Sequence, residues 1–108
     1  MMNKLKPPYY AVIFTTQRTN IDHELYAKTS ARMAELASEQ PGFLGISSAR
    51  GADGVGITVS YWETKENILN WKKNSEHFEA QKSGRNTWYE WYDVKICLVE
   101  REYGARNS

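Results

Sequence analysis

The order in which two hydrophobic periodicities alternate along the chain is the feature that most limits its fold. Runs rich in β-branched and aromatic residues predict strands, and apolar residues at three- and four-residue spacing predict helices. The predicted elements are a strand at 9–17, a helix ending near residue 38, strands at 43–50 and 55–62, a helix after Thr64, and a strand at about 90–101. This order is that of the ferredoxin-like βαββαβ sandwich, an α+β fold with an antiparallel sheet.

Local signals place the two helices and the face that each one buries. Pro41-Gly42 ends the first helix, Thr64 is a good N-cap for the second, and Ser83-Gly84 ends it. The residues predicted to face inward are Tyr26, Thr29, Met33, Leu36 and Ala37 in the first helix, and Ile68, Trp71, Ser75 and Phe78 in the second. Glycines at 51 and 54 predict a tight turn between the second and third strands.

The length of 108 residues leaves room for one domain with one hydrophobic core. Hydrophobic residues make up 41% of the chain and charged residues 25%, and both fractions are in the range of globular proteins. We expect a flexible N-terminal arm at 1–8, a single domain at 9–103, and a flexible tail at 104–108.

Charge and cysteine content exclude several classes of function. The 14 basic and 13 acidic residues give a net charge of +1, which does not indicate a nucleic acid or an anionic membrane as partner. No apolar run approaches the roughly 18 residues that a membrane helix requires, and no apolar stretch typical of a signal peptide precedes Tyr9. The single cysteine, Cys97, excludes an intrachain disulfide. These features predict a cytoplasmic protein.

The predicted sheet is apolar on both faces, although the helices of this fold cover only one. The alternating sets are Tyr9, Ala11, Ile13 and Tyr10, Val12, Phe14 in the first strand, and Val94, Ile96, Leu98 and Lys95, Cys97, Val99 in the last. The terminal segments are too short and polar to cover the second face, so we expect a homodimer. The alternative is that some of these side chains are tolerated at the surface.

Short motifs distributed over about residues 9–103 occur in an order typical of a known family. They are Pro41-Gly42-Phe43, Tyr61-Trp62-Glu63, Ile68, Trp71, Glu76-His77, Ala80-Gln81, Gly84-Arg85, Trp88-Tyr89 and Val99-Glu100-Arg101. In this order the chain resembles the antibiotic biosynthesis monooxygenase superfamily of dimeric α+β barrels. The resemblance implies a homodimer whose sheets pack face to face, with a pocket between the sheet and the helices of each subunit. Members include cofactor-independent oxygenases acting on aromatic phenols and haem-degrading monooxygenases, so the fold alone does not choose the activity.

The cofactor-independent branch implies a monooxygenase that uses no cofactor and acts on an aromatic or quinone-like small molecule. His77 is the candidate base because imidazole titrates near neutral pH, and Arg85 is the candidate to stabilise a substrate anion. The candidate substrate-binding residues are Trp71, Tyr61, Trp88 and Tyr89. The alternative is that His77 is simply exposed and the aromatic residues pack the core or the dimer rim. The protein would then be a non-catalytic dimeric module that binds a ligand or assists a partner.

The haem-degrading branch is the second enzymatic alternative. Its members use an asparagine in the first strand, a tryptophan in the second helix, and a histidine further along that helix as the iron ligand. Trp71 resembles that tryptophan, but residues 12–14 contain no asparagine and the histidine position holds Gln81 or Lys82. Protonated lysine is a poor iron ligand. The sequence also lacks a Walker loop, a GxGxxG motif, an HExxH motif and a serine elbow.

Overall fold

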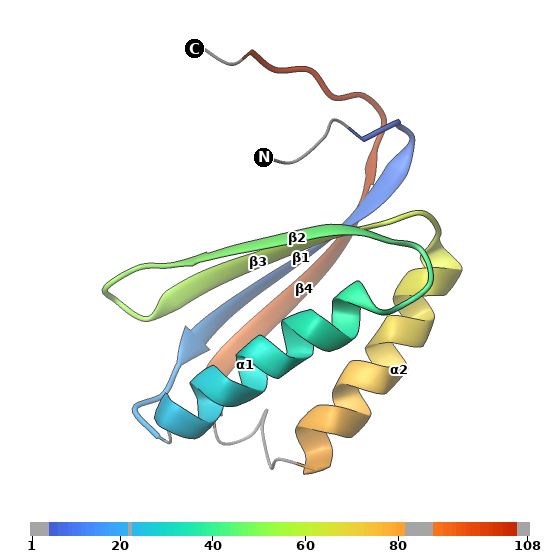
Figure 1. Cartoon of the computed structure of the whole chain (residues 1–108). Helices are drawn as coiled ribbons and strands as arrows, with labels where there is room; N and C mark the ends of the chain where they lie inside the picture. Colours follow the sequence, from blue (N-terminus) through green and yellow to red (C-terminus); the bar gives the residue numbers. More distant parts are fainter. Residues whose placement is uncertain (1–4, 22, 82–87, 106–108) are drawn as a thin grey trace.

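The structure is a computed structural model that describes residues 5–21, 23–81 and 88–105, with residues 77–81 described by their backbone alone. Its elements are β1 (Tyr9–Arg18), α1 (His23–Ser38), β2 (Phe43–Arg50), β3 (Val55–Trp62), α2 (Lys65–Gln81) and β4 (Tyr89–Val99) (Figure 1). The predicted ferredoxin-like α+β order is confirmed, and β2 and β3 have the predicted bounds. The last strand begins one residue earlier than predicted and ends two residues earlier.

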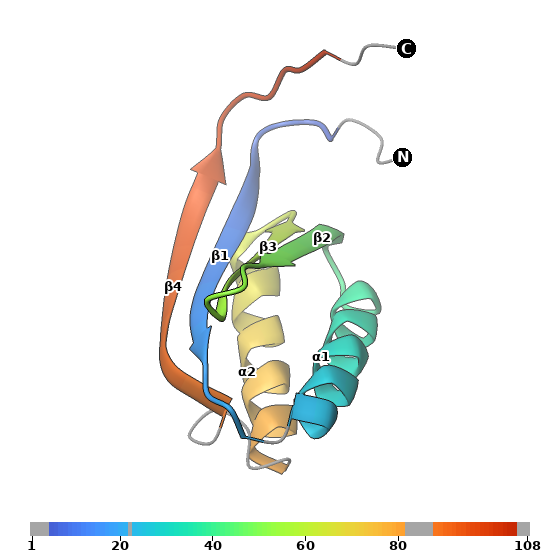
Figure 2. The same ribbon diagram turned by 90° about the vertical axis from the view of Figure 1, so that its left-hand side faces the viewer.

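The four strands form one antiparallel sheet in the order β2-β3-β1-β4. Ile13 of β1 lies opposite Val59 of β3, and Val12 lies opposite Ile96 of β4. Both helices cover the same side of the sheet, and no helix or strand of the described residues covers the other side (Figure 2). We refer to these two sides as the inner face and the outer face.

Turn and capping residues fix where the elements begin and end. Gly42 and Gly54 have φ angles of 79° and 86°, a backbone conformation that only glycine adopts without strain. Gly42 therefore ends the α1–β2 connection, and Gly54 closes the β2–β3 hairpin. The Thr64 hydroxyl accepts a hydrogen bond from the Asn67 backbone N–H at 3.0 Å, which confirms Thr64 as the N-cap of α2.

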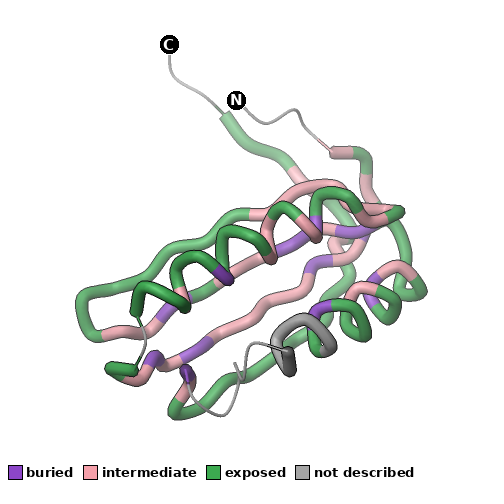
Figure 3. The backbone as a smooth tube through the Cα atoms, turned by 60° about the horizontal axis from the view of Figure 1, so that its bottom comes forward, coloured by how far each residue is buried: buried purple, intermediate pink, exposed green. Residues whose placement is uncertain are grey.

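The tightest packing lies on the inner face, around Trp62 at the end of β3. Trp62 and Ala37 are fully buried, and Ile68 of α2 is 6% exposed. The Trp62 ring stacks with Trp71 at 6.0 Å between centroids, and its Nε1–H donates to Ser60 Oγ at 2.9 Å. β4 is exposed over most of its length, whereas buried positions recur along β1 and β3 (Figure 3).

The outer face is apolar at its centre. Val59 and Tyr61 alternate with the inward-facing Ser60 and Trp62, so they lie on the outer face together with Ile13. These three side chains are half-buried, and Ile57 on the same face is 47% exposed.

Neither helix of the described residues has the length and apolar character that a membrane span requires.

Tyr9 occupies the end of this outer face, where β1 begins. Its side chain is 4% exposed and meets Tyr61 edge-on at 5.7 Å. Burial raises the pKa of the Tyr9 hydroxyl, and the nearby Glu102 carboxylate raises that pKa further through its charge and a hydrogen bond. Tyr9 therefore keeps its proton at pH values at which an ordinary tyrosine loses it.

Candidate functional site

A cavity of about 890 Å³ lies between the inner face of the sheet and the two helices. Its volume is typical of sites for small organic molecules. The described residues that line it are Val12, Phe14, Thr16, Tyr26, Thr29, Ser30, Met33, Ala34, Ile46, Ser47, Ser48, Arg50, Thr58, Ser60, Ile68, Trp71, Lys72, Ser75, Glu76, Trp88, Tyr89, Tyr92, Asp93, Val94 and Ile96. We call it the main cavity.

Aromatic rings form much of its wall. Trp71 is positioned by its stacking on the buried Trp62. At the other end, Trp88 is 2% exposed and Tyr26 meets it edge-on at 5.6 Å between centroids. Tyr26 also meets Tyr89 edge-on at 6.0 Å. Rings packed in this way offer flat, rigid surfaces to an aromatic ligand.

The remaining wall combines aliphatic side chains with eight hydroxyl groups. The hydroxyls belong to Thr16, Thr29, Ser30, Ser47, Ser48, Thr58, Ser60 and Ser75. Three of them have partners within the protein. Ser60 accepts the Trp62 N–H, Ser75 donates to the Lys72 carbonyl at 3.0 Å, and Thr16 accepts a hydrogen bond from Arg50. A wall of this kind suits a ligand that is mainly apolar but bears several oxygen atoms.

Arg50 is the cationic group at one end of the main cavity. Its Nη2 donates to the Thr16 hydroxyl and to the Tyr26 hydroxyl, both at 3.0 Å, and its Nη1 donates to the Gly54 carbonyl. Opposite Arg50 in the β2–β3 ladder is Gly56, whose missing side chain leaves room for the guanidinium. The sequence did not identify Arg50 as a site residue, because its partners come from β1 and α1.

Arg18, at the end of β1, is a second cation that the sequence did not single out. Its side chain is 7% exposed, and it donates to the Trp88 carbonyl at 2.6 Å and to the Ile21 carbonyl at 3.2 Å. Its guanidinium carbon lies 3.9 Å from the centroid of the Tyr26 ring. Arg18 therefore ties the aromatic wall around Tyr26 and Trp88 to the end of β1.

The structure brings three of the predicted site residues to the main cavity. Trp71, Trp88 and Tyr89 all line it. Tyr61 does not join them, since strand alternation places it on the outer face, where it contacts Tyr9. His77 lies in the last part of α2, where only the backbone is described, and Arg85 lies outside the described residues.

The residues relevant to haem or metal binding are distributed as follows. Val12 and Phe14 line the main cavity at the strand position where haem degraders hold an asparagine. Gln81 is described by its backbone alone, and Lys82 lies outside the described residues. Within the described part of the chain, no three His, Cys, Asp or Glu side chains gather as metal ligands. Cys97 is exposed on the outer face of β4.

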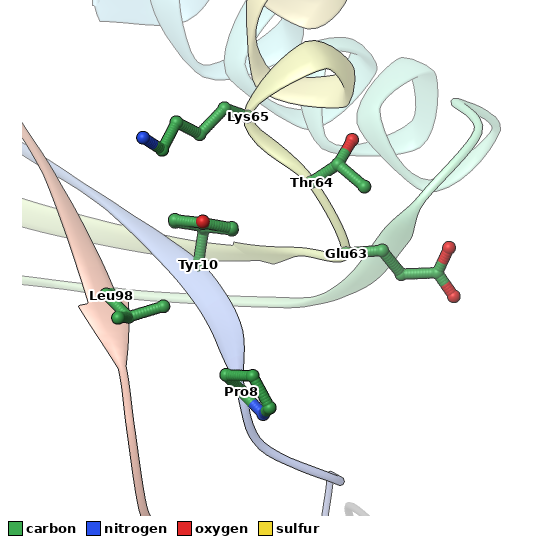
Figure 4. A pocket seen from close by; sticks show the side chains of 6 residues that line it. All are labelled: Pro8, Tyr10, Glu63, Thr64, Lys65 and Leu98. Carbon is green, nitrogen blue, oxygen red and sulfur yellow. The ribbon is translucent and has the colours of Figure 1, made fainter.

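A smaller pocket of about 390 Å³ lies where β1 begins and α2 starts (Figure 4). Its lining residues are Pro8, Tyr10, Glu63, Thr64, Lys65 and Leu98. The Lys65 ammonium lies 5.8 Å from the centroid of the Tyr10 ring, and the Glu63 carboxylate points away from both. The main cavity is larger and has far more aromatic and hydroxyl groups, so we place the candidate site there.

Comparisons with known proteins agree with this architecture. The antibiotic biosynthesis monooxygenase family model matches residues 10–83. An uncharacterized protein of Bacillus subtilis (strain 168), YqjZ, is 48% identical over 97 residues, which cover 90% of this chain and 84% of that protein.

Solved structures share the fold at low sequence identity. Rv0793 from Mycobacterium tuberculosis superposes with a TM-score of 0.73 at 11% identity, covering 89% of this chain and 99% of that one. SnoaB, a cofactor-independent oxygenase from Streptomyces nogalater, superposes with a TM-score of 0.63 at 14% identity, covering 94% of this chain and 97% of that one. The sequence match over most of the chain shows that the protein belongs to the antibiotic biosynthesis monooxygenase family.

Proposed function

We propose that the protein is a cofactor-independent monooxygenase that oxidises an aromatic phenol or enol bound in the main cavity. The observation that supports this best is the cavity itself, with Trp71, Trp88 and Tyr89 in its wall and a volume of about 890 Å³. Family membership and the fold shared with an oxygenase of this type are consistent with the proposal. The substrate class is aromatic or quinone-like.

The proposed reaction needs a base, an anion-stabilising group and a dry cavity. A base removes a proton from the phenol or enol, and the resulting anion transfers one electron to dioxygen. The substrate radical and superoxide combine into a hydroperoxide, which loses water to leave a quinone. A ring CH₂ and one O₂ thus become one C=O and one H₂O, so the substrate supplies all four electrons.

His77 is our proposed base, and Arg85 is our proposed anion-stabilising group. The support for His77 is its helix, since Trp71, Ser75 and Glu76 of α2 all contribute to the cavity wall. The support for Arg85 is its position in the family-like sequence, shortly before Trp88. Trp71, Trp88 and Tyr89 would hold the substrate ring system between them.

We further propose that the protein acts as a homodimer through the outer face. The support is the apolar centre of that face, where Ile13, Val59 and Tyr61 are only half-buried in the single chain. A second copy of the sheet would remove this apolar surface from water.

A non-catalytic ligand-binding module is the competing proposal. It is favoured by one observation, which is that none of the described residues lining the main cavity is a histidine. If His77 does not act as a base, the same cavity would bind an aromatic molecule without transforming it.

Oxygen uptake with a dihydroxyanthrone as substrate separates the two proposals. We expect uptake coupled to formation of the anthraquinone, and a decrease of roughly 10²–10⁴-fold in His77→Ala if a general base is lost. Lys73→Ala is the matched control, because Lys73 is an exposed residue of the same helix and does not line the main cavity. Binding of the substrate without turnover would support the module, and turnover unchanged in His77→Ala would remove His77 from the mechanism.

A further inference from the structure

The guanidinium of Arg50 is held in place by neutral groups. Its three hydrogen bonds to described residues go to two hydroxyls and one backbone carbonyl. One of these acceptors, Thr16, is a residue of β1 that is only 2% exposed, so the sheet fixes its position. Within the described part of the chain, no carboxylate forms an ion pair with Arg50.

This arrangement orients the cation without neutralising it. An arginine has five N–H groups, and the described contacts use three of them. The donors left over are the Nε–H and one N–H of Nη1, and each can form a charge-assisted hydrogen bond with a carboxylate oxygen.

Tyr26 keeps the guanidinium at the cavity. The tyrosine ring is fixed by the Arg18 guanidinium on it and by edge contacts with Trp88 and Tyr89. Its hydroxyl is therefore a stationary acceptor for Arg50 Nη2. The same ring contributes to the cavity wall, so the cationic group and the aromatic surface adjoin each other.

None of the other charged side chains among the described lining residues forms an ion pair with the Arg50 guanidinium. They belong to Lys72, Glu76 and Asp93. Lys72 and Glu76 lie on α2, and the Asp93 carboxylate is paired with the Lys95 ammonium. Arg50 is thus the only guanidinium among the described lining residues.

We propose that the main cavity selects an anionic aromatic molecule whose carboxylate binds Arg50 while its rings lie against the aromatic wall. This inference rests on the proposed function, which it narrows from aromatic molecules in general to aromatic carboxylates. Arg50 is a specificity-determining residue at the end of the cavity, and Tyr26 and Thr16 position its guanidinium.

A pair of ligands that differ only in charge tests the proposal. Isothermal titration calorimetry on the full chain would compare 2-naphthoate with 2-naphthamide, which has the same shape but is neutral. We expect naphthoate to bind at least about tenfold more tightly at low salt, and the preference to fall as ionic strength rises. Arg50→Gln should abolish the preference, whereas Arg32→Gln should keep it, because Arg32 is an exposed arginine of α1 that pairs with Glu35.

A measurement on the unaltered protein covers the case in which Arg50→Gln does not fold. In that protein the NMR signal of the Arg50 Nε–H group should shift on addition of naphthoate and stay in place with naphthamide. Equal affinities of the two ligands, or a preference kept in Arg50→Gln, would overturn the inference while leaving an aromatic site intact. If neither ligand binds, the proposed function fails together with it.

Discussion

The Arg50 guanidinium lies directly over the backbone of Gly56, its partner across the β2–β3 ladder. A Cβ atom on Gly56 would come within 2.5 Å of the Arg50 guanidinium carbon. Arg50 can take this position only because residue 56 is a glycine, although Gly56 is not among the described residues that line the main cavity.

The substitution Gly56→Ala is expected to displace the guanidinium and leave the fold in place. The obstructing atoms belong to the end of a flexible side chain, so we expect the free energy of unfolding to change by no more than about 1 kcal/mol. The preference for naphthoate over naphthamide should fall to that of Arg50→Gln. Gly104→Ala is the matched control, because nothing lies within 4 Å of the added methyl group. An unchanged preference in Gly56→Ala would contradict the role of Gly56.

Loss of the Ser60 hydroxyl is expected to destabilise the core. Ser60→Ala removes the acceptor of the buried Trp62 N–H, and an unsatisfied buried donor costs about 1–3 kcal/mol. Urea denaturation followed by tryptophan fluorescence would measure the free energy of unfolding. Ser48→Ala makes the same chemical change at an exposed position of β2 and should stay within about 0.5 kcal/mol of the unaltered protein. Equal stability of the two variants would show that the Trp62–Ser60 hydrogen bond contributes nothing.

The Tyr9 hydroxyl is expected to make stability depend on pH in the alkaline range. Its pKa in the folded protein is raised above the ordinary value of 10.0, so the folded state keeps a proton that the unfolded chain loses. Its contribution is fully present below about pH 10 and declines as the pH rises through the folded pKa. The difference in unfolding free energy between the unaltered protein and Tyr9→Phe should therefore shrink from pH 9 to pH 11.

The control for Tyr9 is Tyr103→Phe, which removes a phenol from a ring that is 83% exposed. Subtracting its pH profile accounts for the general effect of losing one tyrosine. A difference between the unaltered protein and Tyr9→Phe that stays constant up to pH 11 would contradict the raised pKa.

The outer face is expected to join two chains. Light scattering at micromolar concentration should give twice the mass of one chain, and Val59→Lys should reduce it to the mass of a monomer. A lysine at position 59 would bury a charge opposite Ile13, at the apolar centre of the face. Leu69→Lys introduces the same charge at a residue of α2 that is 52% exposed, and it should remain dimeric. A stable monomer of the unaltered protein would refute this assembly.

The parts of the fold that local residues determine were predictable from the sequence. The bounds of β2 and β3 follow from Gly42 and Gly54, and the start of α2 follows from Thr64, because each acts on its immediate neighbours. The same alternation that placed Val59 and Tyr61 on one face also shows why Tyr61 does not line the cavity. Once Trp62 faces the helices, Tyr61 must face away from them.

The cationic end of the cavity could not be predicted in this way. Arg50 and its partner Thr16 are 34 residues apart, and Arg18 and its partner Trp88 are 70 residues apart. The sequence around an arginine at the end of a strand does not show whether its guanidinium is solvated or donates hydrogen bonds to three acceptors. The one local signal was Gly56, since the turn at 51–54 already sets it opposite Arg50.

The eight serine and threonine hydroxyl groups of the main cavity affect how strictly it can choose among ligands. A hydroxyl group rotates freely and can either donate or accept a hydrogen bond, so one wall can serve different patterns of ring oxygens without any movement of the backbone. Arg50 has no such freedom, because it only donates and its charge is permanent. The protein would then tolerate wide variation in where a substrate is oxygenated, and its selectivity would depend on whether that substrate carries a negative charge at one end.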